Sequence, residues 1–292
     1  MMKKSLSEKI FTFFNVILLS VLSFVCLYPL IYVLSASLSS PEFISGGKVW
    51  LWPKGFTIDA FIKVIQRKGI WMAYGNSFYY MIVGTLVQLI VTTLGAYPLS
   101  RKYLIGRKPL NLMVSFTMWF SGGLIPLYLT FKDYGLLNTR AAIIFGFACS
   151  AYNFILLRTY FEGLPTELEE AAKIDGASDF RIMAKIFLPL AKPSLATIGL
   201  FYAVNRWNGY IWPMLLMKDD SKIPLQVVLK KLVVDMSGRM DSVSLADGAG
   251  MNISEESVMY ATMVMAIVPM LMLYPFIQKY FVKGITLGAV KG

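Results

Sequence analysis

Long apolar runs constrain this chain more than any other feature. Six of them occur, each bounded by charged or turn residues. A helix needs roughly 20 apolar residues to cross the hydrocarbon of a bilayer, and a helix is the only open-ended structure that satisfies its own backbone there. The alternating pattern of a membrane barrel is absent. We therefore predict an all-α integral membrane protein with six transmembrane helices, at about 10–38, 76–100, 109–131, 140–161, 194–217 and 258–281.

Composition supports a lipid environment. Hydrophobic residues make up 57% of the chain and charged residues 15%, against about 25% charged in a typical soluble domain. Disorder is excluded, and lipid has to replace the missing charged surface. Lys3 and Lys4 ahead of an apolar run also describe a secretory signal, but this run is longer than a signal core, so we predict a retained first span. No repeat or soluble domain is visible, so we predict that residues 1–292 form one transmembrane domain.

The distribution of basic residues predicts the orientation. The net charge of +11 raises the question of nucleic acid, yet no basic stripe with interleaved aromatics occurs, and no nucleic-acid partner is expected. Basic residues of membrane proteins gather on cytoplasmic loops. Residues 101–108 carry four basic side chains and no acidic one, whereas the long loops 39–75 and 218–257 lie on the opposite side. Both termini are therefore predicted to be cytoplasmic.

Several kinds of chemistry are missing from the sequence. The chain has no histidine, and Cys26 and Cys149 both sit in apolar runs, so we expect no metal site, no disulfide and two buried free thiols. No phosphate-binding loop is present, and no other catalytic motif was found. The spans also lack the Asp and Glu typical of ion-coupled carriers. If the protein does work, the energy must therefore be supplied by another molecule, and no cofactor is expected on this chain.

The segment 162–193 between the fourth and fifth spans is the most informative. Thr166 with Glu169 forms a predicted capping box at the start of a short helix. Gly176 suits the left-handed position that ends it, and Ser178 can cap a second helix. Pro189 and the later Pro193 then stop or bend that helix. The result is a helix, a sharp turn and a second helix in the cytoplasm. An amphipathic hairpin lying on lipid headgroups is the alternative interpretation.

The same segment resembles a known family. The sequence Glu170-Ala171-Ala172, followed by Gly176 and by Ile-Phe-Leu-Pro at 186–189, resembles the EAA loop in membrane subunits of bacterial binding-protein-dependent ABC importers. The Asn-Ser at 76–77, the Trp-Asn at 207–208 and the closing residues 283–292 are similar to the carbohydrate-uptake class. The likeness covers nearly the whole chain, and it is closest to the smaller, six-span subunit of maltose and related oligosaccharide importers.

The resemblance implies a fold, partners and a role. It implies the type I ABC importer permease fold in the bacterial cell membrane, without an ATPase site of its own. The partners would be a second permease, two ATP-binding cassette subunits that hold ATP and Mg²⁺, and an extracytoplasmic solute-binding protein. The short helix would dock into a cleft on an ATPase subunit. The residues that carry this coupling would be Glu167, Glu170, Ala171, Ala172, Asp175, Gly176, Ala177 and Pro189.

Polar residues inside the spans are the candidates for a substrate path. Saccharides are bound by aromatic faces and by amide hydrogen bonds, which selects Asn153, Asn205, Trp207 and Asn208. Hydrogen bonding between helices is the alternative role for these residues. Arg206 is costly inside a membrane, so it should face a cavity, a carbonyl or the interface.

The predicted function is import of an oligosaccharide or polysaccharide fragment. Two alternatives are import of a non-sugar solute and a membrane-embedded enzyme of the glycosyltransferase type. Such an enzyme would need carboxylates on a catalytic loop at the membrane surface, whereas most carboxylates expected in the cytoplasm fall in the 162–193 segment. Only the importer should be purified together with an ATPase and a second permease.

Overall fold

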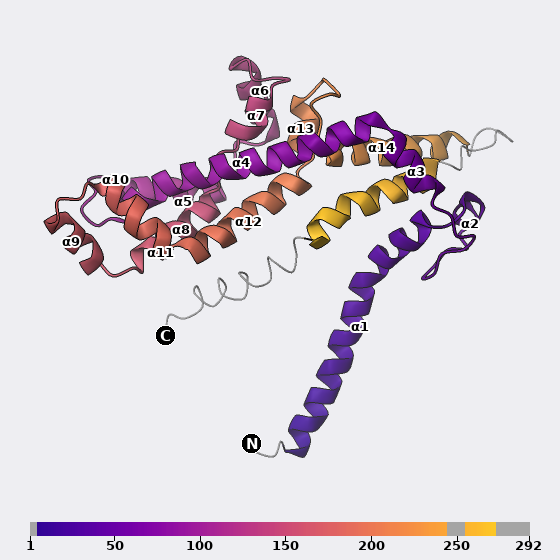
Figure 1. The fold of residues 1–292 in the computed structure, drawn as a ribbon, viewed down its shortest axis with the longest axis horizontal. Helices are drawn as coiled ribbons and strands as arrows, with labels where there is room; N and C mark the ends of the chain where they lie inside the picture. Colours follow the sequence, from indigo (N-terminus) through magenta and orange to yellow (C-terminus); the bar gives the residue numbers. More distant parts are fainter. Residues whose placement is uncertain (1–4, 244–254, 273–292) are drawn as a thin grey trace. The chain divides into compact units, whose positions relative to one another are not determined.

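The computed structural model describes residues 5–243 and 255–272 of the chain (Figure 1). These residues are mainly helical, and among them the only β-bridge pairs Ser39 with Phe56. The predicted residues 273–281 of the last span and the closing residues 283–292 lie outside the described part. The described helices are α1 (Leu6–Ser37), α2 (Pro41–Ser45), α3 (Asp59–Gln66), α4 (Lys68–Ser100), α5 (Arg107–Trp119), α6 (Leu124–Asp133), α7 (Arg140–Phe145), α8 (Ala151–Glu162), α9 (Glu167–Ile174), α10 (Asp179–Ile182), the π-helix η1 (Met183–Phe187), α11 (Leu188–Leu190), α12 (Lys192–Asn208), α13 (Ile211–Leu216), α14 (Leu225–Val243) and Glu255–Met272.

Three described helices are long and apolar enough to cross a membrane: α1, α4 and Glu255–Met272. Two bent pairs raise this number to five if each pair is one span. The pair α5 and α6 bends by 116°, and the pair formed by Asp179–Leu190 and α12 bends by 83°. The all-helical membrane class predicted from the sequence agrees with this architecture.

Three of the predicted runs are divided in the structure, and glycine marks each break. Gly123, between α5 and α6, has a φ of +87°, which a side chain with a Cβ rarely adopts. Gly146 follows α7, where a Cβ would lie 2.3 Å from the ring of Phe131. Gly209 ends α12 in an extended conformation. Apolar composition indicates how much chain can enter lipid, but it does not show where the helix stops.

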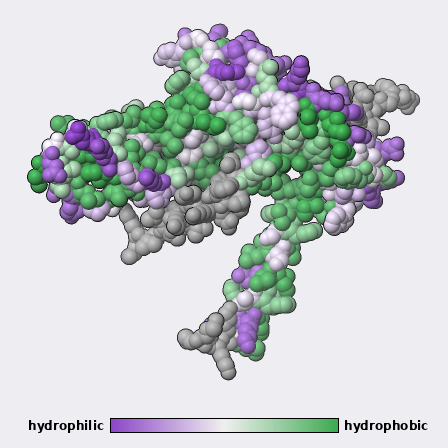
Figure 2. All heavy atoms as spheres, viewed as in Figure 1, coloured by the Kyte–Doolittle hydropathy of each residue, from purple (hydrophilic) through white to green (hydrophobic). Residues whose placement is uncertain are grey.

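The chain forms two compact units, which we describe separately. The first contains the residues before Gly69 together with Leu229–Val268. In it, Ala36, Ile44 and Val49 form a small core beneath the loop after α1, and Tyr32 packs edge-to-face on Tyr260 with ring centroids 5.9 Å apart. Apolar side chains lie exposed along α1, as Figure 2 shows. A surface of this kind needs lipid or another chain to cover it.

The second unit is built on Gly69–Val228, with α4, α8 and α12 at its centre. Near the end of α4, Tyr97, Phe161 and Phe187 pack edge-to-face with centroids 5.3 to 6.0 Å apart. A second cluster around Tyr80, Phe131 and Ile143 lies farther back along α4. These two clusters position the two candidate sites described below.

The prediction of buried thiols was wrong, since both Cys26 and Cys149 are exposed in the chain. Both thiols are free. An apolar sequence environment does not by itself bury a side chain, because in a membrane protein the apolar face of a helix can point outward to lipid.

Candidate functional site

The segment 162–193 folds as a short helix, a tight turn and a second helix (Figure 1). Gly176 ends α9 with a φ of +73°, and the Oγ of Ser178 accepts a hydrogen bond from the backbone N–H of Arg181 at 3.4 Å. Both local predictions are confirmed. The helix after Ser178 continues through η1 and α11, and the chain then bends into α12 at Ala191, between Pro189 and Pro193, as the proline positions predicted.

The capping box at the start of α9 was a wrong prediction. Thr166 has helical backbone angles, φ −73° and ψ −25°, and its side chain makes no capping hydrogen bond. The reason lies in Glu169, whose carboxylate cannot reach back to the backbone because other groups hold it. Its Oε2 accepts from Arg101 and its Oε1 from Lys173, both at 2.7 Å. Tertiary contacts therefore override the local motif.

Glu169 is the functional candidate that the sequence did not reveal. It is the one buried residue of α9, and the side chains of Arg101 and Glu169 are 4% and 8% exposed. Burial alone would raise the pKa of the Glu169 carboxyl, but hydrogen bonds from Lys173 and Arg101 outweigh burial and lower it. The same hydrogen bond raises the pKa of Lys173, which also lies 3.8 Å from the ring centre of Tyr103. The carboxylate is thus held in its charged form.

The coupling residues predicted from the resemblance lie mostly on the open side of this segment. Six are exposed, and Ala172 and Ala177 are half-buried against the core near Phe187. The exposed ones are Glu167, Glu170, Ala171, Asp175, Gly176 and Pro189. Two large apolar side chains, Ile174 and Phe180, are 87% and 69% exposed beside them. The face combines charge with apolar surface, which suits contact with another protein.

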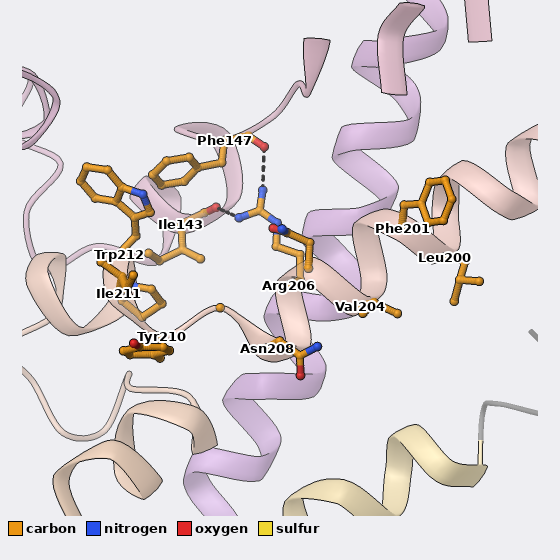
Figure 3. Close-up of a pocket in the computed structure, with 13 residues that line it drawn as sticks. Ile143, Phe147, Leu200, Phe201, Val204, Arg206, Asn208, Tyr210, Ile211 and Trp212 are labelled. Carbon is orange, nitrogen blue, oxygen red and sulfur yellow. Dashed lines mark hydrogen bonds between the residues drawn. The ribbon is translucent and has the colours of Figure 1, made fainter. Parts of the chain in front are cut away.

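A cavity of about 780 Å³ lies between the end of α12, α13 and the segment around α7 (Figure 3). Two of the four candidate path residues, Asn205 and Asn208, line it. Tyr210 and Trp212 add aromatic rings on the α13 side, and Leu200, Phe201 and Val204 add apolar surface along α12. Within the described residues no three His, Cys, Asp or Glu side chains are grouped to hold a metal ion. Rings and amides are suited to an uncharged polar face such as that of a sugar.

The other two candidates lie elsewhere. Trp207 is 1% exposed and packs against Phe78 and Tyr74 of α4, with centroids 5.1 and 6.2 Å away. Asn153 is buried in α8 at 5% exposure. The structure therefore brings Asn205 and Asn208 together at the cavity, whereas Trp207 and Asn153 are buried in packed positions and do not line it. The role of all four in transport stays a prediction.

Arg206 occupies the wall of this cavity and meets carbonyl groups, one of the three settings predicted for it. Its guanidinium donates to the carbonyl oxygens of Ile143 and of Phe147, the latter at 2.9 Å (Figure 3). It also donates to the carbonyl oxygen of Ile144 at 3.3 Å. Its Nε donates to Gln88 Oε1 at 3.1 Å, and Gln88 Nε2 donates to the same Phe147 carbonyl at 2.8 Å. These carbonyls are left open where α7 ends, so Arg206 and Gln88 together satisfy the break in the fourth predicted span.

The Asn-Ser pair at 76–77 fixes a loop on the other side of the second cluster. Asn76 Nδ2 donates to the carbonyls of Ser221 and Ile223 at 2.8 and 3.1 Å, and Ser77 Oγ accepts from the backbone N–H of Leu225 at 2.8 Å. Arg140 donates to Asn76 Oδ1 at 3.0 Å. The motif thus orders the loop before α14, a role that sequence spacing could not reveal because the partners lie about 145 residues away.

Comparison with known proteins gives matches along nearly the whole chain. A family model described as binding-protein-dependent transport system inner membrane component matches residues 1–287. The polygalacturonan/rhamnogalacturonan transport system permease protein YtcP of Bacillus subtilis (strain 168) is 42% identical, over 92% of this chain and 93% of that protein. The arabinooligosaccharides transport system permease protein AraQ of Halalkalibacterium halodurans is 30% identical over 93% of each chain.

Solved structures give the same result. A bacterial ABC transporter involved in import of the acidic polysaccharide alginate contains a chain that is 41% identical, with a TM-score of 0.86 over 96% of this chain and 100% of that one. A chain from the alginate transporter in complex with a periplasmic protein bound to an alginate pentasaccharide has a TM-score of 0.61 at 14% identity, covers 91% of this chain and 92% of that chain, and supports the fold alone. The resemblance to sugar-importer permeases predicted from the sequence is confirmed.

Proposed function

The chain belongs to the family of binding-protein-dependent transport system inner membrane components, and from this we propose that it is the transmembrane subunit of an ATP-driven importer for an oligosaccharide or polysaccharide fragment. The observation that carries the proposal is the exposed α9 segment, which stands at the end of a membrane domain whose relatives are named as sugar permeases. We also propose six spans, cytoplasmic termini and a place in the bacterial cell membrane.

The proposed assembly follows from the two exposed regions of the second unit. The face of α9 that bears Glu167, Glu170 and Ala171 docks on one of two ATP-binding cassette subunits, which hold ATP and Mg²⁺. A second, similar permease covers the apolar surfaces. The loop ordered by Asn76 contributes to the surface that receives an extracytoplasmic solute-binding protein. Closure of the ATPase pair moves α9, and the two permeases rock between inward-facing and outward-facing states.

The cavity beside α12 is the proposed translocation path. Asn205 and Asn208 offer amide donors and acceptors, and Tyr210 and Trp212 offer rings for sugar faces. Chemistry of this kind binds a saccharide weakly and releases it again, as transport requires.

The charge beside the cavity favours an acidic cargo. Among the described residues no carboxylate forms an ion pair with Arg206, and the helices α4, α7, α12 and α13 contain no Asp or Glu. Carbonyl oxygens solvate the guanidinium but leave its positive charge uncompensated. Relatives about 40% identical are named for polygalacturonan and for the acidic polysaccharide alginate. We therefore infer that the cargo is an oligosaccharide that carries carboxylates.

The coupling assignment is tested by substitution at Gly176 in the assembled transporter, with binding-protein-stimulated ATP hydrolysis as the measurement. A Cβ at Gly176 meets no atom within 4 Å, so the φ of +73° is the only obstacle to a side chain. Gly176→Val should abolish stimulation, because a β-branched residue is strongly disfavoured at positive φ, and Gly176→Ala should reduce it less. Normal stimulation in Gly176→Val, or failure of the wild-type chain to be purified with an ATPase, would contradict the proposed function.

A further inference from the structure

Arg101 differs from the other basic residues of its loop. It directly follows α4, which ends at Ser100, and its side chain is buried, whereas Lys102 and Lys108 are exposed and Arg107 is only partly covered. Basic loop residues are expected at the membrane surface for their charge alone. A buried arginine in that position needs another explanation, because burying a charge without partners is costly.

Its contacts provide that explanation. The guanidinium donates to Glu169 Oε2 of α9 at 2.7 Å and to the carbonyl oxygen of Phe161 in α8 at 2.7 Å. Its Nε donates to Ser100 Oγ at 2.9 Å. The same group lies 4.5 Å from the ring centre of Phe187 in η1 and 5.4 Å from that of Tyr97 in α4. One side chain therefore contacts α4, α8, α9 and η1.

The attachment of α9 to the rest of the unit depends largely on this contact. Glu169 is the only buried residue of α9, and its other ion-pair partner, Lys173, belongs to the same helix and is 40% exposed. Lys173 also reaches outside α9, to the ring of Tyr103 and to Asp179 at 3.6 Å, but both of these residues are exposed. Ala172 adds a half-buried contact with the core. Because these other contacts are exposed or only half-buried, a force applied to the exposed face of α9 reaches the buried core chiefly through Arg101, or else breaks a buried ion pair.

The helix η1, whose Phe187 packs on Arg101, is also unusual because it is a π-helix. Phe187 is the last residue of η1, and single π-turns within helices are frequent at functional sites. The chain bends by 83° just beyond it, on entering α12, the helix that carries Asn205 and Asn208. The guanidinium thus stacks on the segment that leads from the α9 region to the cavity.

We propose that Arg101 is a positioning residue which, through Glu169, makes α9 and the ends of α4 and α8 move as one body. This inference rests on the proposed function only for the force that moves α9, which a partner ATPase would supply. The contacts of Arg101 with Glu169, Phe161 and Phe187, which we call the Arg101 joint, lie within the second unit. Loss of Arg101 would let α9 move under its partner without moving α4, so ATP hydrolysis would continue while transport failed.

The joint is tested by the distance between spin labels at Leu94 of α4 and Leu168 of α9, in a chain with Cys26 and Cys149 replaced by serine. Both label sites are exposed. In the purified transporter the distance distribution should be narrow and should stay unchanged between the nucleotide-free and ATP–vanadate states. Arg101→Gln should broaden it, and the exposed-neighbour control Lys102→Gln should not. A wild-type distance that shifts with nucleotide, or an Arg101→Gln distribution as narrow as wild type, would overturn the proposal.

A transport measurement separates positioning from folding. Arg101→Gln should lower saccharide transported per ATP hydrolysed about fivefold to tenfold, within the usual range of coupling between sites. The double variant Arg101→Gln with Glu169→Gln removes both charges, so recovery of assembled transporter should return while transport per ATP stays low. Restored transport in the double variant would show that the pair only stabilises the fold, and would refute the proposal. If the wild type moves no saccharide but the label distances behave as expected, the proposed function fails and the joint stands.

Discussion

The second unit holds two arginines in different ways, Arg101 fully buried and Arg206 partly buried, and the difference separates its two sites. Arg101 lies next to a carboxylate, Glu169, at 2.7 Å, whereas Arg206 lies among the carbonyls of Ile143, Ile144 and Phe147. The first charge is cancelled by an opposite charge, and the second is only solvated by dipoles. A cancelled pair makes a stiff joint between elements. A solvated cation leaves a positive field in the cavity that it borders.

The two settings also differ in what they hold together. Arg101 joins the ends of α4 and α8 to the exposed α9, and it therefore lies where force enters. Arg206 satisfies the backbone at a helix break inside an apolar region, where Gly84 lets α4 approach closely: a Cβ there would lie 3.0 Å from Arg206 Nε. Arginine thus transmits movement between helices at position 101 and maintains the shape of the cavity at position 206.

The largest effect is expected where the opposite charge is removed. Glu169→Gln leaves Arg101 buried without a counter-charge, which should lower the free energy of unfolding by about 3 to 5 kcal/mol. The matched control is Glu170→Gln, the exposed neighbour, which should change it by less than about 0.5 kcal/mol. Thermal unfolding in detergent measures both. Equal effects in the two variants would mean that the buried pair contributes nothing special.

A smaller effect is expected at the carbonyl-bound arginine. Arg206→Gln retains some hydrogen bonding but leaves carbonyl oxygens of the α7 end without donors, so we expect a loss of roughly 1 to 3 kcal/mol in the free energy of unfolding. The control is Lys192→Gln at the start of the same helix, where no such contacts exist among the described residues. Unfolding followed by tryptophan fluorescence gives the comparison. A loss as large as that of Glu169→Gln would show that the two arginines are not held differently.

The smallest effect is a difference in acid sensitivity. The pKa of Glu169 is lowered in the folded chain, so its contribution to stability is present above its ordinary value near 4.5 and is lost as the pH falls through the lower, folded value. Arg206 has no carboxylate partner among the described residues, so its contacts should persist in that range. Wild type should therefore lose stability below pH 4.5 more steeply than Glu169→Gln. Parallel stability curves would contradict the ion-pair account.

Local sequence rules predicted the features whose partners are near in the chain. Gly176 and Ser178 act within a few residues, so their roles in the turn and cap could be predicted and are confirmed. The predicted capping box of Thr166 and Glu169 failed because Thr166 has helical backbone angles and because Glu169 is held by Arg101, 68 residues away. A contact between residues so far apart in the chain leaves no local pattern in the sequence from which it could be predicted.

The same limit applies to the spans and the cavity. Apolar length predicted the helical membrane class but not the breaks, because a break needs its exposed carbonyls satisfied from elsewhere, here by Arg206 about 60 residues away. Asn205 and Asn208, three residues apart on α12, both reach the cavity, while the intervening Trp207 points into the packing with α4. Helical spacing could have separated these residues had the position of the cavity been known.

The central claim is that this chain forms the path of an ATP-driven importer for acidic oligosaccharides, and uptake into vesicles tests it most directly. The complete transporter, with its second permease, ATPase subunits and binding protein, is given labelled oligogalacturonate or the fully methyl-esterified, uncharged oligosaccharide. We predict ATP-dependent accumulation of the acidic form, less of the esterified form, and a smaller difference between them in Arg206→Gln. Accumulation of neither saccharide by an assembled, ATP-hydrolysing transporter would contradict the claim.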